Sequence, residues 1–303
     1  MKRALLLFNP EATSVSRSVR DVIAHALSSE LKLEIAETKR RHHATHIARG
    51  ASHEGFDIIV CLGGDGTLNE VANGMAGSQT ALVPLPGGGT NVFARTMGLP
   101  NDPIEATSIV LARIVEGTEP RRITLGRVNE RIFLCNVGIG FDAAVVQAVE
   151  RRMRLRRRVG DAYYVFQGLR TFFFAYPRRD PALALDLAGE RTAAFHQVVV
   201  CNSNPYTYLG TMPLQLCPMA AQERGLDVTA FSSFRTTTVL RVLARAFGSG
   251  GHTKFRSVCA LHDLDAFTLT ATRPALYQVD GDLAGEDSTF TFRSMPDTLS
   301  VIA

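Results

Sequence analysis

Residues 61–70 read Cys61-Leu-Gly63-Gly64-Asp65-Gly66-Thr67-Leu68-Asn69-Glu70. A short, mostly apolar run at residues 57–62 precedes the glycines and a helical pattern follows them, which predicts a buried strand, a tight turn and a helix. Glycine lets the backbone take positive φ and come close to an anion, and Thr67 is suited to cap the helix or to donate to a phosphate oxygen. The segment therefore predicts a phosphate-binding loop.

Asp65 is unexpected in a loop arranged for anions. A carboxylate there is unfavourable unless a cation intervenes, so it indicates Mg²⁺ carried in with a nucleotide. A second loop also follows a buried strand and leads into a helix, and it reads Pro84-Leu-Pro86-Gly87-Gly88-Gly89-Thr90-Asn91. Ligands of open α/β sheets bind outside the carboxyl ends of the strands, so we expect the two loops to form one phosphate crevice.

Better known nucleotide motifs do not account for these loops. The sequence has no G-x-x-x-x-G-K-[ST] and neither of the protein-kinase signatures H-R-D and D-F-G. Gly138-Ile-Gly140-Phe-Asp-Ala143 matches a dinucleotide fingerprint, but no parallel strand and acidic residue follow it at the required distance. We interpret that segment as a turn.

The pattern of the chain changes near residue 121. Before it, strands at residues 4–8, 31–35, 57–62 and 81–85 alternate with helices, the last of which begins after Asp102 with proline at its first position and stops at Gly117. This order predicts a parallel sheet with helices on both faces. After it, the predicted strands are consecutive, at residues 123–128, 132–137, 182–187, 197–201, 226–231, 267–272 and 289–292. Helices at residues 141–167 and 236–247 interrupt this mainly antiparallel half.

Composition and charge narrow the class of protein. The chain has 303 residues, of which 46% are hydrophobic, and none of its apolar runs approaches the roughly 18 residues that span a bilayer. Its five cysteines are widely spaced and odd in number, which argues against a disulfide framework and favours a reducing cytosol. Residues 151–158 contain six arginines, and subtracting them from the net charge of +4 leaves −2. One local basic patch disfavours a nucleic-acid binder.

The two glycine loops and the later Asp280-Gly281-Asp282 resemble, in this order, motifs of the diacylglycerol kinase catalytic-domain family. These bacterial lipid kinases are related to sphingosine and ceramide kinases and, more distantly, to NAD kinases. The resemblance covers nearly the whole chain. It implies an α/β plus β fold: a Rossmann-like parallel α/β nucleotide-binding domain at residues 1–121, joined by a C-terminal strand at 294–303, and an antiparallel β-sandwich domain at 122–293 that holds the acceptor.

The same resemblance implies ATP and Mg²⁺ as cofactors and assigns site residues. With the loop glycines, the nucleotide contacts are Asn9, Thr38, Gly63, Gly64, Asp65, Gly66, Thr67, Asn69, Glu70, Gly88, Gly89, Thr90 and Asn91. Where the family has a glutamate as general base, this chain has Asp282, which keeps the carboxylate that proton removal requires. Asp65 is the alternative base, and a hairpin turn is the alternative interpretation of residues 280–282.

A further metal site implied by the family is altered here. The family often holds a regulatory Mg²⁺ with an Asp-Asp-Gly segment, whereas this chain has Glu223-Arg224-Gly225 followed by Asp227. Glu223 and Asp227 are the candidate ligands, but a cation beside Arg224 would be repelled by roughly 4 kcal/mol at 4 Å. We expect the site not to keep its usual form. His42, His43 and His46 have no partner at ligand spacing, and we interpret them as surface helix residues.

A basic run next to an aromatic run indicates contact with an anionic membrane surface. The candidate contacts are Arg151, Arg152, Arg154, Arg156, Arg157, Arg158, Phe172 and Phe173. A solvated helix face followed by a core helix is the alternative.

The sequence as a whole predicts a cytoplasmic kinase, peripheral to the inner membrane face, that phosphorylates a lipid hydroxyl, with diacylglycerol as the first candidate. The alternatives are a kinase of another lipid or of a soluble, NAD-like acceptor, and a non-catalytic nucleotide- or lipid-binding protein. The acceptor lipid is left open, as is a homodimer.

Overall fold

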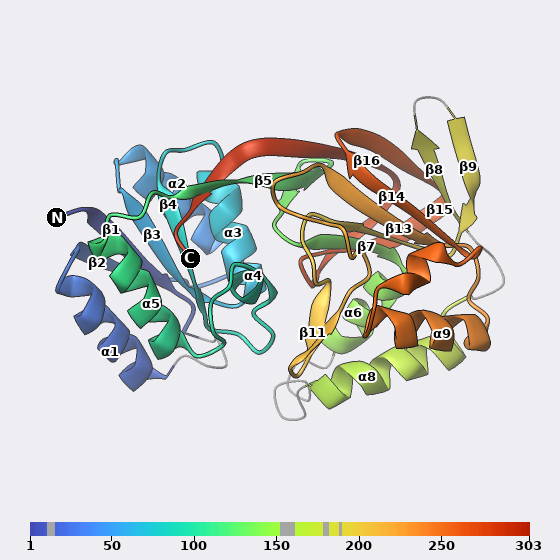
Figure 1. Ribbon diagram of the computed structural model, residues 1–303, viewed down its shortest axis with the longest axis horizontal. Helices are drawn as coiled ribbons and strands as arrows, with labels where there is room; N and C mark the ends of the chain where they lie inside the picture. Colours follow the sequence, from blue (N-terminus) through green and yellow to red (C-terminus); the bar gives the residue numbers. More distant parts are fainter. Residues whose placement is uncertain (11–15, 152–160, 178–181, 188–189) are drawn as a thin grey trace. The chain divides into compact units, whose positions relative to one another are not determined.

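The computed structural model describes residues 1–10, 16–151, 161–177, 182–187 and 190–303. The chain forms two compact units, one made of Met1–Leu125 with Pro296–Ala303 and the other of Gly126–Met295. Figure 1 shows the first unit in blue to green, except for its red C-terminal segment, and the second in green to red. The predicted fold class, α/β followed by antiparallel β, is confirmed.

The first unit is built on parallel strands in the order β2-β1-β3-β4, with the end of β16 beside β4. Its strands are β1 (Arg3–Phe8), β2 (Lys32–Glu37), β3 (Ile58–Gly63) and β4 (Ala81–Pro86). The central strands β3 and β4 are buried along their whole length, as continuous apolar runs in a parallel sheet require. The carboxyl ends of β3 and β4 pair at Gly63 and Pro86, so the loops that follow them start side by side.

Helices cover this sheet as the alternating pattern predicts. The helices are α1 (Arg17–Ser28), α2 (His43–His53), α3 (Asp65–Met75), α4 (Val92–Thr96) and α5 (Pro103–Val115). Ile23 and Leu27 of α1 share one core cluster with Ala106 and Val110 of α5 and with alternate strand residues. The Asp102 side chain accepts from the N–H groups of Ile104 and Glu105, so the predicted start of α5 is confirmed.

The second unit is a mainly antiparallel sheet in the order β14-β13-β10-β7-β15-β16. Its strands are β5 (Arg121–Val128, shared with the first unit), β6 (Arg131–Phe133), β7 (Asn136–Gly140), β8 (Leu183–Leu187), β9 (Glu190–Phe195), β10 (Gln197–Cys201), β11 (Thr207–Leu209), β12 (Met212–Leu214), β13 (Leu226–Phe231), β14 (Val258–Leu264), β15 (Ala266–Val279) and β16 (Asp282–Val301). β16 is long enough to pair with β15 in this unit and with β4 in the first.

Both faces of this second sheet are covered, because alternate residues of its strands enter different cores. Val198 and Val200 of β10 belong to one cluster with the side chains of β7, β13, β15 and β16. Val199 and Cys201 point the other way, into a cluster that includes helix residues. The helices are α6 (Phe141–Glu150), α8 (Asp161–Arg170), the π-helix η1 (Thr171–Ala175), α9 (Thr236–Ala246) and the short η2 (Gly251–Lys254).

Candidate functional site

The two glycine loops of the first unit lie against one another. The Gly87 N–H donates to the Gly63 carbonyl at 2.9 Å, which extends the β3–β4 pairing into the loops. A Cβ on Gly88 would stand 2.8 Å from the Cα of Gly64, and one on Gly64 would stand 3.3 Å from the Cα of Gly88. Since both neighbours are backbone atoms, this approach needs glycine on both sides. The structure therefore brings the two predicted loops together at one edge of the sheet.

Asp65 holds a neighbouring helix. Its two carboxylate oxygens accept hydrogen bonds from the N–H groups of Val92 and Phe93, at 3.0 and 2.9 Å. These are the first two residues of α4, whose preceding residue, Asn91, provides no side-chain cap. A carboxylate is the favoured partner for such N–H groups. The anomaly in the sequence thus has a structural explanation: Asp65 joins the first glycine loop to the helix that follows the second.

Glu70 does the same for a different helix. Its carboxylate accepts from the N–H groups of His42 and Ala44, at 2.8 and 3.1 Å, where α2 begins without a side-chain cap of its own. The Thr45 hydroxyl donates to the Glu70 carbonyl as well. Burial, and to a lesser degree the Glu70 charge, raise the pKa of the Cys61 thiol, so this cysteine stays neutral in its strand. Glu70 thereby anchors α2 on α3.

The remaining nucleotide candidates lie on several elements of the first unit. Asn91 has φ of 50° and spans the second loop, accepting from the Gly88 N–H at 2.7 Å and donating to the Gly88 carbonyl at 2.9 Å. The Asn9 amide lies 3.5 Å from the Thr67 hydroxyl, and the Thr38 N–H donates to the Phe8 carbonyl. Gly89 is exposed, with no atom within 4 Å of an added Cβ. Asn69 is a buried residue in the middle of α3, and its carbonyl and side-chain oxygens accept hydrogen bonds from the Asn73 amide.

An anion fits this place better than a protein-held cation. α3 starts at Asp65, and its N-cap residue Gly64 provides no side-chain cap, so its first-turn N–H groups favour a phosphate. Asp65, by contrast, already accepts two backbone hydrogen bonds. In the described part of the chain, no three or more His, Cys, Asp and Glu side chains are grouped so that they could hold a metal ion. The structure thus builds no metal cage at Asp65, although Mg²⁺ bound to nucleotide phosphates needs only one or two protein carboxylates.

In the second unit, residues 280–282 form a tight hairpin. β15 ends at Val279 and β16 begins at its partner Asp282, which leaves Asp280 and Gly281 as a two-residue loop with φ of 48° and 85°. Positive φ at both positions is the pattern of a type I′ turn, for which Asp-Gly is a preferred pair. The turn interpretation and the base interpretation are compatible, because Asp282 is the first residue after the turn.

The first carboxylate of this hairpin belongs to the fold. Asp280 accepts from the N–H groups of Leu134, Cys135 and Asn136, at 2.8, 2.8 and 2.9 Å, and is 8% exposed. Three backbone hydrogen bonds to one buried carboxylate fix the hairpin on the segment that leads into β7.

The backbone on both sides of Asp282 is tied to other side chains. The Gly281 N–H donates to Gln278 Oε1 at 2.7 Å, and the Leu283 N–H donates to Glu150 Oε1 at 3.0 Å. Glu150 is the last residue of α6, so a helix end and a strand side chain together hold this short segment. Asp282 itself is half-buried. These contacts set the direction of its backbone.

A polar cluster beside the hairpin was not predicted; Asn136 and Gln278 in it are buried, and Asp142 and Tyr206 are half-buried. Gln278 Nε2 donates to Asp142 Oδ2 at 2.8 Å and to Asn136 Oδ1 at 3.0 Å, with the Tyr206 hydroxyl at 3.4 Å. Burial raises the pKa of the Asp142 carboxyl, while hydrogen bonds from Tyr206 and Gln278 oppose the shift. Burial, followed by the nearby Asp142, also raises the pKa of Tyr206. We name Asn136, Asp142, Tyr206 and Gln278 the amide–carboxyl cluster.

One signal in the sequence could have led to this cluster. A Cβ on Gly138 would stand 1.8 Å from Asp142 Oδ2, so glycine is required there for the Asp142 carboxylate to reach Gln278. The segment Gly138-Ile-Gly140-Phe-Asp-Ala143 is therefore a strand-to-helix junction with a packing requirement, since Gly140 stands at the start of α6. The Asn202–Tyr206 loop also faces residues 134–136, where Asn202 donates to the Leu134 carbonyl.

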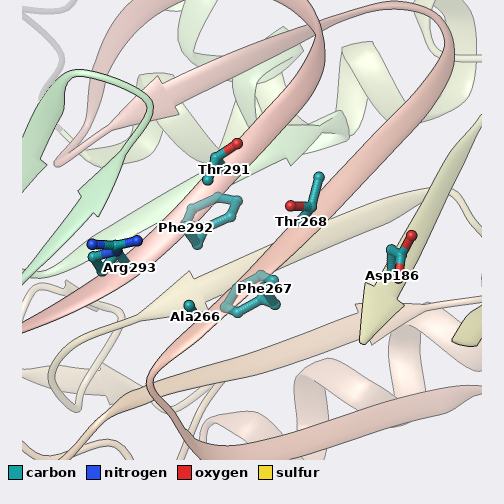
Figure 2. Close-up of a pocket in the computed structure, with 7 residues that line it drawn as sticks. All are labelled: Asp186, Ala266, Phe267, Thr268, Thr291, Phe292 and Arg293. Atoms are coloured by element: carbon teal, nitrogen blue, oxygen red, sulfur yellow. The ribbon is translucent and has the colours of Figure 1, made fainter. Parts of the chain in front are cut away.

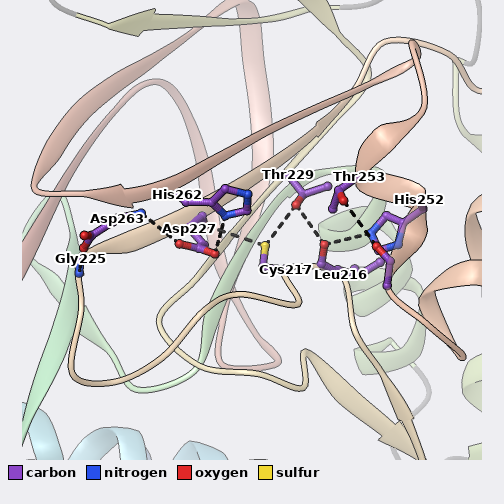
Figure 3. A network of polar contacts seen from close by, with 10 residues as sticks. Leu216, Cys217, Gly225, Asp227, Thr229, His252, Thr253, His262 and Asp263 are labelled. Atoms are coloured by element: carbon purple, nitrogen blue, oxygen red, sulfur yellow. Dashed lines mark hydrogen bonds and ion pairs between the residues drawn. The ribbon is translucent and has the colours of Figure 1, made fainter.

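The proposed regulatory metal site has other contacts. Figure 3 shows Asp227 accepting from the Asp263 N–H at 3.1 Å and lying 2.9 Å from His262 Nδ1, while Asp263 accepts from the Gly225 N–H at 2.7 Å. Glu223 is exposed. Asp227 is 3% exposed and its oxygens are occupied by these donors, so these residues do not fit a bound cation.

The same network continues through the core to a second histidine (Figure 3). The Thr229 hydroxyl donates to the Leu216 carbonyl at 2.9 Å, and His252 Nε2 lies 3.0 Å from that carbonyl. Burial lowers the pKa of His252, which is fully buried, so its neutral form is favoured. The network is a structural one.

A hollow of about 400 Å³ lies elsewhere on the second unit. Figure 2 shows its lining on β8, β15 and β16: Asp186, Ala266, Phe267, Thr268, Thr291, Phe292 and Arg293. None of the predicted site residues lines it. It is therefore not assigned to the site.

The predicted membrane contacts are only partly described. Arg152, Arg154, Arg156, Arg157 and Arg158 lie outside the described residues, and Arg151 is exposed. The prediction for Phe172 is wrong. Its ring packs edge-to-face on Phe141 within a core cluster and is only 6% exposed, so it cannot contact a membrane. Phe173 is 47% exposed and Phe174 is 86% exposed. Within the described ranges, we find no helix both long and apolar enough to cross a membrane.

Two family models match the chain. "Diacylglycerol kinase catalytic domain" matches residues 3–127 and "YegS C-terminal NAD kinase beta sandwich-like domain" matches residues 135–303. Curated relatives named diacylglycerol kinase, from Staphylococcus aureus strains bovine RF122 / ET3-1 and MRSA252, are 32% identical over 169 residues, which is 54% of this chain. The chain spans about half, 51%, of the length of these relatives.

Solved structures show the same fold over the whole chain. A crystal structure of a candidate diacylglycerol kinase from Bacillus anthracis str. Sterne has a TM-score of 0.78 at 20% identity, covering 99% of this chain and 96% of its own. Another structure from that organism, named as a diacylglycerol kinase, has a TM-score of 0.70 at 18% identity, with 99% and 96% covered. At these identities the likeness establishes the fold alone.

Proposed function

The chain belongs to the diacylglycerol kinase catalytic-domain family, and on that basis we propose that it is an ATP-dependent lipid kinase. It would transfer the γ-phosphoryl group of ATP to a lipid hydroxyl, with diacylglycerol as the first candidate and phosphatidic acid as the product. The first unit would bind the nucleotide and the second the acceptor. The enzyme would work at the cytoplasmic face of a membrane.

The observation that supports this most strongly is the contact between the two glycine loops. Gly64 and Gly88 approach so closely that neither tolerates a Cβ without displacement, directly beyond the carboxyl ends of β3 and β4. Backbone N–H groups of two such loops, together with the first turn of α3, provide donors for phosphate oxygens. The nucleotide would reach Gly89 and Thr90 from the solvent side. Asn9, Thr38 and Thr67 would complete the nucleotide contacts.

Phosphoryl transfer depends mostly on positioning and charge neutralisation. Mg²⁺ bound with the nucleotide would neutralise charge on the β- and γ-phosphate oxygens. Asp65 and Glu70 would act on the shape of the loop, because their carboxylates hold the starts of α4 and α2. A rigid pair of loops binds phosphates without first having to be ordered.

Asp282 would accept the proton of the acceptor hydroxyl. A general base must be within hydrogen-bond reach of that proton. The backbone on both sides of Asp282 is held in place by the side chains of Gln278 and Glu150. Asp280 is 8% exposed and accepts from three backbone N–H groups, whereas Asp282 is half-buried, so a substrate hydroxyl can approach Asp282 more readily.

The test is phosphorylation of a lipid. Purified protein, γ-labelled ATP, Mg²⁺ and a mixed lipid extract in anionic micelles are incubated and extracted with organic solvent, with Asp282→Asn as the control. We expect label in an organic-phase product that mass spectrometry identifies and that the variant fails to make. Label in an aqueous product would instead indicate a soluble acceptor of NAD-like chemistry. Thermal stabilisation by ATP without any labelled product would indicate a non-catalytic binder.

A further inference from the structure

The second unit has an outer layer that is unusually apolar for an exposed surface. Among the described residues, half of the exposed large hydrophobic side chains lie on three short helices: Val165, Phe166 and Leu169 on α8, Phe173 and Phe174 on η1, and Leu240 and Leu243 on α9. We call these seven residues the docking face. Scattered exposed hydrophobic residues are normal on a protein surface, but a concentration on adjacent elements marks an interaction site.

Two of the helices of the docking face, η1 and α9, cover one face of one sheet, and α8 runs directly into η1. Phe172 of η1 and Val242 and Ala246 of α9 enter the same core cluster, on the side of β10 and β13 to which Val199 and Phe231 point. The ring of Phe172 lies 6.1 Å from that of Phe234, just before α9. With their inner sides packed on a shared core, η1 and α9 turn their outer sides away from the same sheet. In Figure 1, α8 and α9 lie along one edge of this unit.

Helical spacing continues the apolar stripe from α8 into η1. Val165, Leu169 and Phe173 recur every four residues, whereas Tyr163 and Gln167 on the inner side are buried and joined by a hydrogen bond of 2.7 Å. On α9, Leu240 and Leu243 are exposed while Val242 and Ala246 are buried. The outer side of each helix thus carries large apolar side chains, joined on α9 by arginines, whereas the outer side of an ordinary solvated helix is mainly polar.

The charge around α9 has one sign. Between Asp227 and Asp263 the chain contains no acidic residue but five basic ones, all exposed: Arg235, Arg241, Arg245, Lys254 and Arg256. Arg241 and Arg245 alternate with Leu240 and Leu243 on α9 itself. Apolar and aromatic side chains set among arginines match a membrane surface, where anionic headgroups lie over an apolar acyl layer.

We propose that the docking face seats the second unit on an anionic phospholipid bilayer, with α9 supplying the basic contacts. The inference rests on the proposed function for its purpose, since it would deliver the enzyme to an acceptor that resides in a membrane. A second copy of the chain is the less favourable occupant, because two such basic surfaces would repel one another. A neutral protein partner is also less favourable, because it has no anionic groups to pair with the five exposed basic side chains.

The absence of tryptophan from the sequence makes a direct test simple. Leu240→Trp on α9 and Phe174→Trp on η1 each place one fluorophore on the docking face, and Val115→Trp is the control, since Val115 is 63% exposed on α5 of the first unit. The probes are phosphatidylglycerol–phosphatidylcholine vesicles and pure phosphatidylcholine vesicles, each with brominated acyl chains. We expect blue-shifted, strongly quenched emission at positions 240 and 174 with the anionic vesicles, and unchanged emission at position 115.

Two results would overturn the proposal. Equal quenching at position 115 would mean that the chain has no defined docking face. A blue shift at position 240 that grows with protein concentration, without lipid, would assign this surface to self-association.

Charge reversal tests the basic contribution. Arg241→Glu with Arg245→Glu should weaken binding to the anionic vesicles at least tenfold, and Arg17→Glu with Lys32→Glu, exposed on the first unit, imposes the same change in net charge and should weaken it less than threefold. Equal losses in the two variants would contradict the proposal.

Activity separates this inference from the proposed function. The α9 double variant should phosphorylate a short-chain acceptor in detergent as the unaltered chain does, and should lose activity only on the acceptor embedded in vesicles. If no acceptor is phosphorylated by the unaltered chain, the proposed function fails, while the fluorescence result still decides the docking face.

Discussion

In the glycine loop of the first unit and in the hairpin of the second, an acidic side chain accepts backbone hydrogen bonds. The two side chains differ in how many bonds they accept and in how deeply they are buried. Asp65 accepts two backbone hydrogen bonds and Asp280 accepts three, and in both cases the donors belong to a distant segment. Asp280 is 8% exposed, whereas Asp65 is partly exposed at the loop. In both motifs, an acidic residue that the sequence associates with catalysis or nucleotide binding therefore also holds distant segments of the chain together.

The difference between the two regions bears on the choice of general base. In the hairpin, one carboxylate is committed to the fold and a second, Asp282, follows two residues later on a backbone tied at Gly281 and Leu283. In the glycine loop, Asp65 and Glu70 are both engaged by helix starts. Stability measurements can therefore separate the roles of Asp65 and Asp282, which turnover alone cannot.

The largest effect is expected at Asp280. Asp280→Ala would leave three buried N–H groups without an acceptor, at a cost of about 3–5 kcal/mol in the free energy of unfolding. Urea denaturation of the variant and of Asp287→Ala, an exposed carboxylate on the same strand pair, measures the difference. A loss below about 1 kcal/mol at Asp280 would mean that the hairpin is held by other contacts.

Asp65→Asn should lose less stability, about 1–3 kcal/mol, because its NH₂ group would face one of the two N–H donors. Asp282→Asn should cost less than about 1 kcal/mol and yet lower turnover by about 10²–10⁴-fold if it is the base. Thermal unfolding and lipid phosphorylation are measured on both variants. The opposite pattern, a stable Asp65→Asn without turnover beside an active Asp282→Asn, would make Asp65 the base.

Gly88→Ala tests the contact between the loops. Its Cβ would stand 2.8 Å from the Gly64 Cα, so the loops must separate, at about 1–3 kcal/mol of stability and with loss of the thermal shift produced by MgATP. Gly89→Ala is the matched control, since nothing lies within 4 Å of the added Cβ. If both variants keep the shift, the close approach of the loops is not needed for nucleotide binding.

The smallest effect concerns pH and Asp142. Because burial raises the pKa of Asp142, the folded chain keeps this proton to a higher pH than the unfolded chain, whose Asp has a pKa near 3.9. Its contribution to the free energy of unfolding is therefore largest below about pH 4 and falls as pH rises through the raised value. Asp142→Asn should flatten that part of the curve, and Glu286→Gln, an exposed change, should not. Urea titrations at several pH values measure the slopes.

Much of the fold was predictable because local patterns specify local structure. Apolar runs located β3 and β4 within one residue, and the Asp102-Pro103 pair located the start of α5. The gathering of the two glycine loops was predictable too, since parallel strands end at one edge. The exposure of individual aromatic residues was not: Phe172 and Phe173 are neighbours in the sequence, yet one is core and the other surface.

By itself, the sequence determined the alternation of strands and helices, the two glycine turns and the Asp-Gly hairpin, because each depends on residues close together in the chain. Only the tertiary structure decided which carboxylates serve the fold. Asp65 and Val92 are 27 residues apart, Glu70 and Ala44 are 26 apart, and Asp280 and Leu134 are 146 apart. Such hydrogen bonds exist only once the elements have packed, and packing depends on contacts that no local pattern contains.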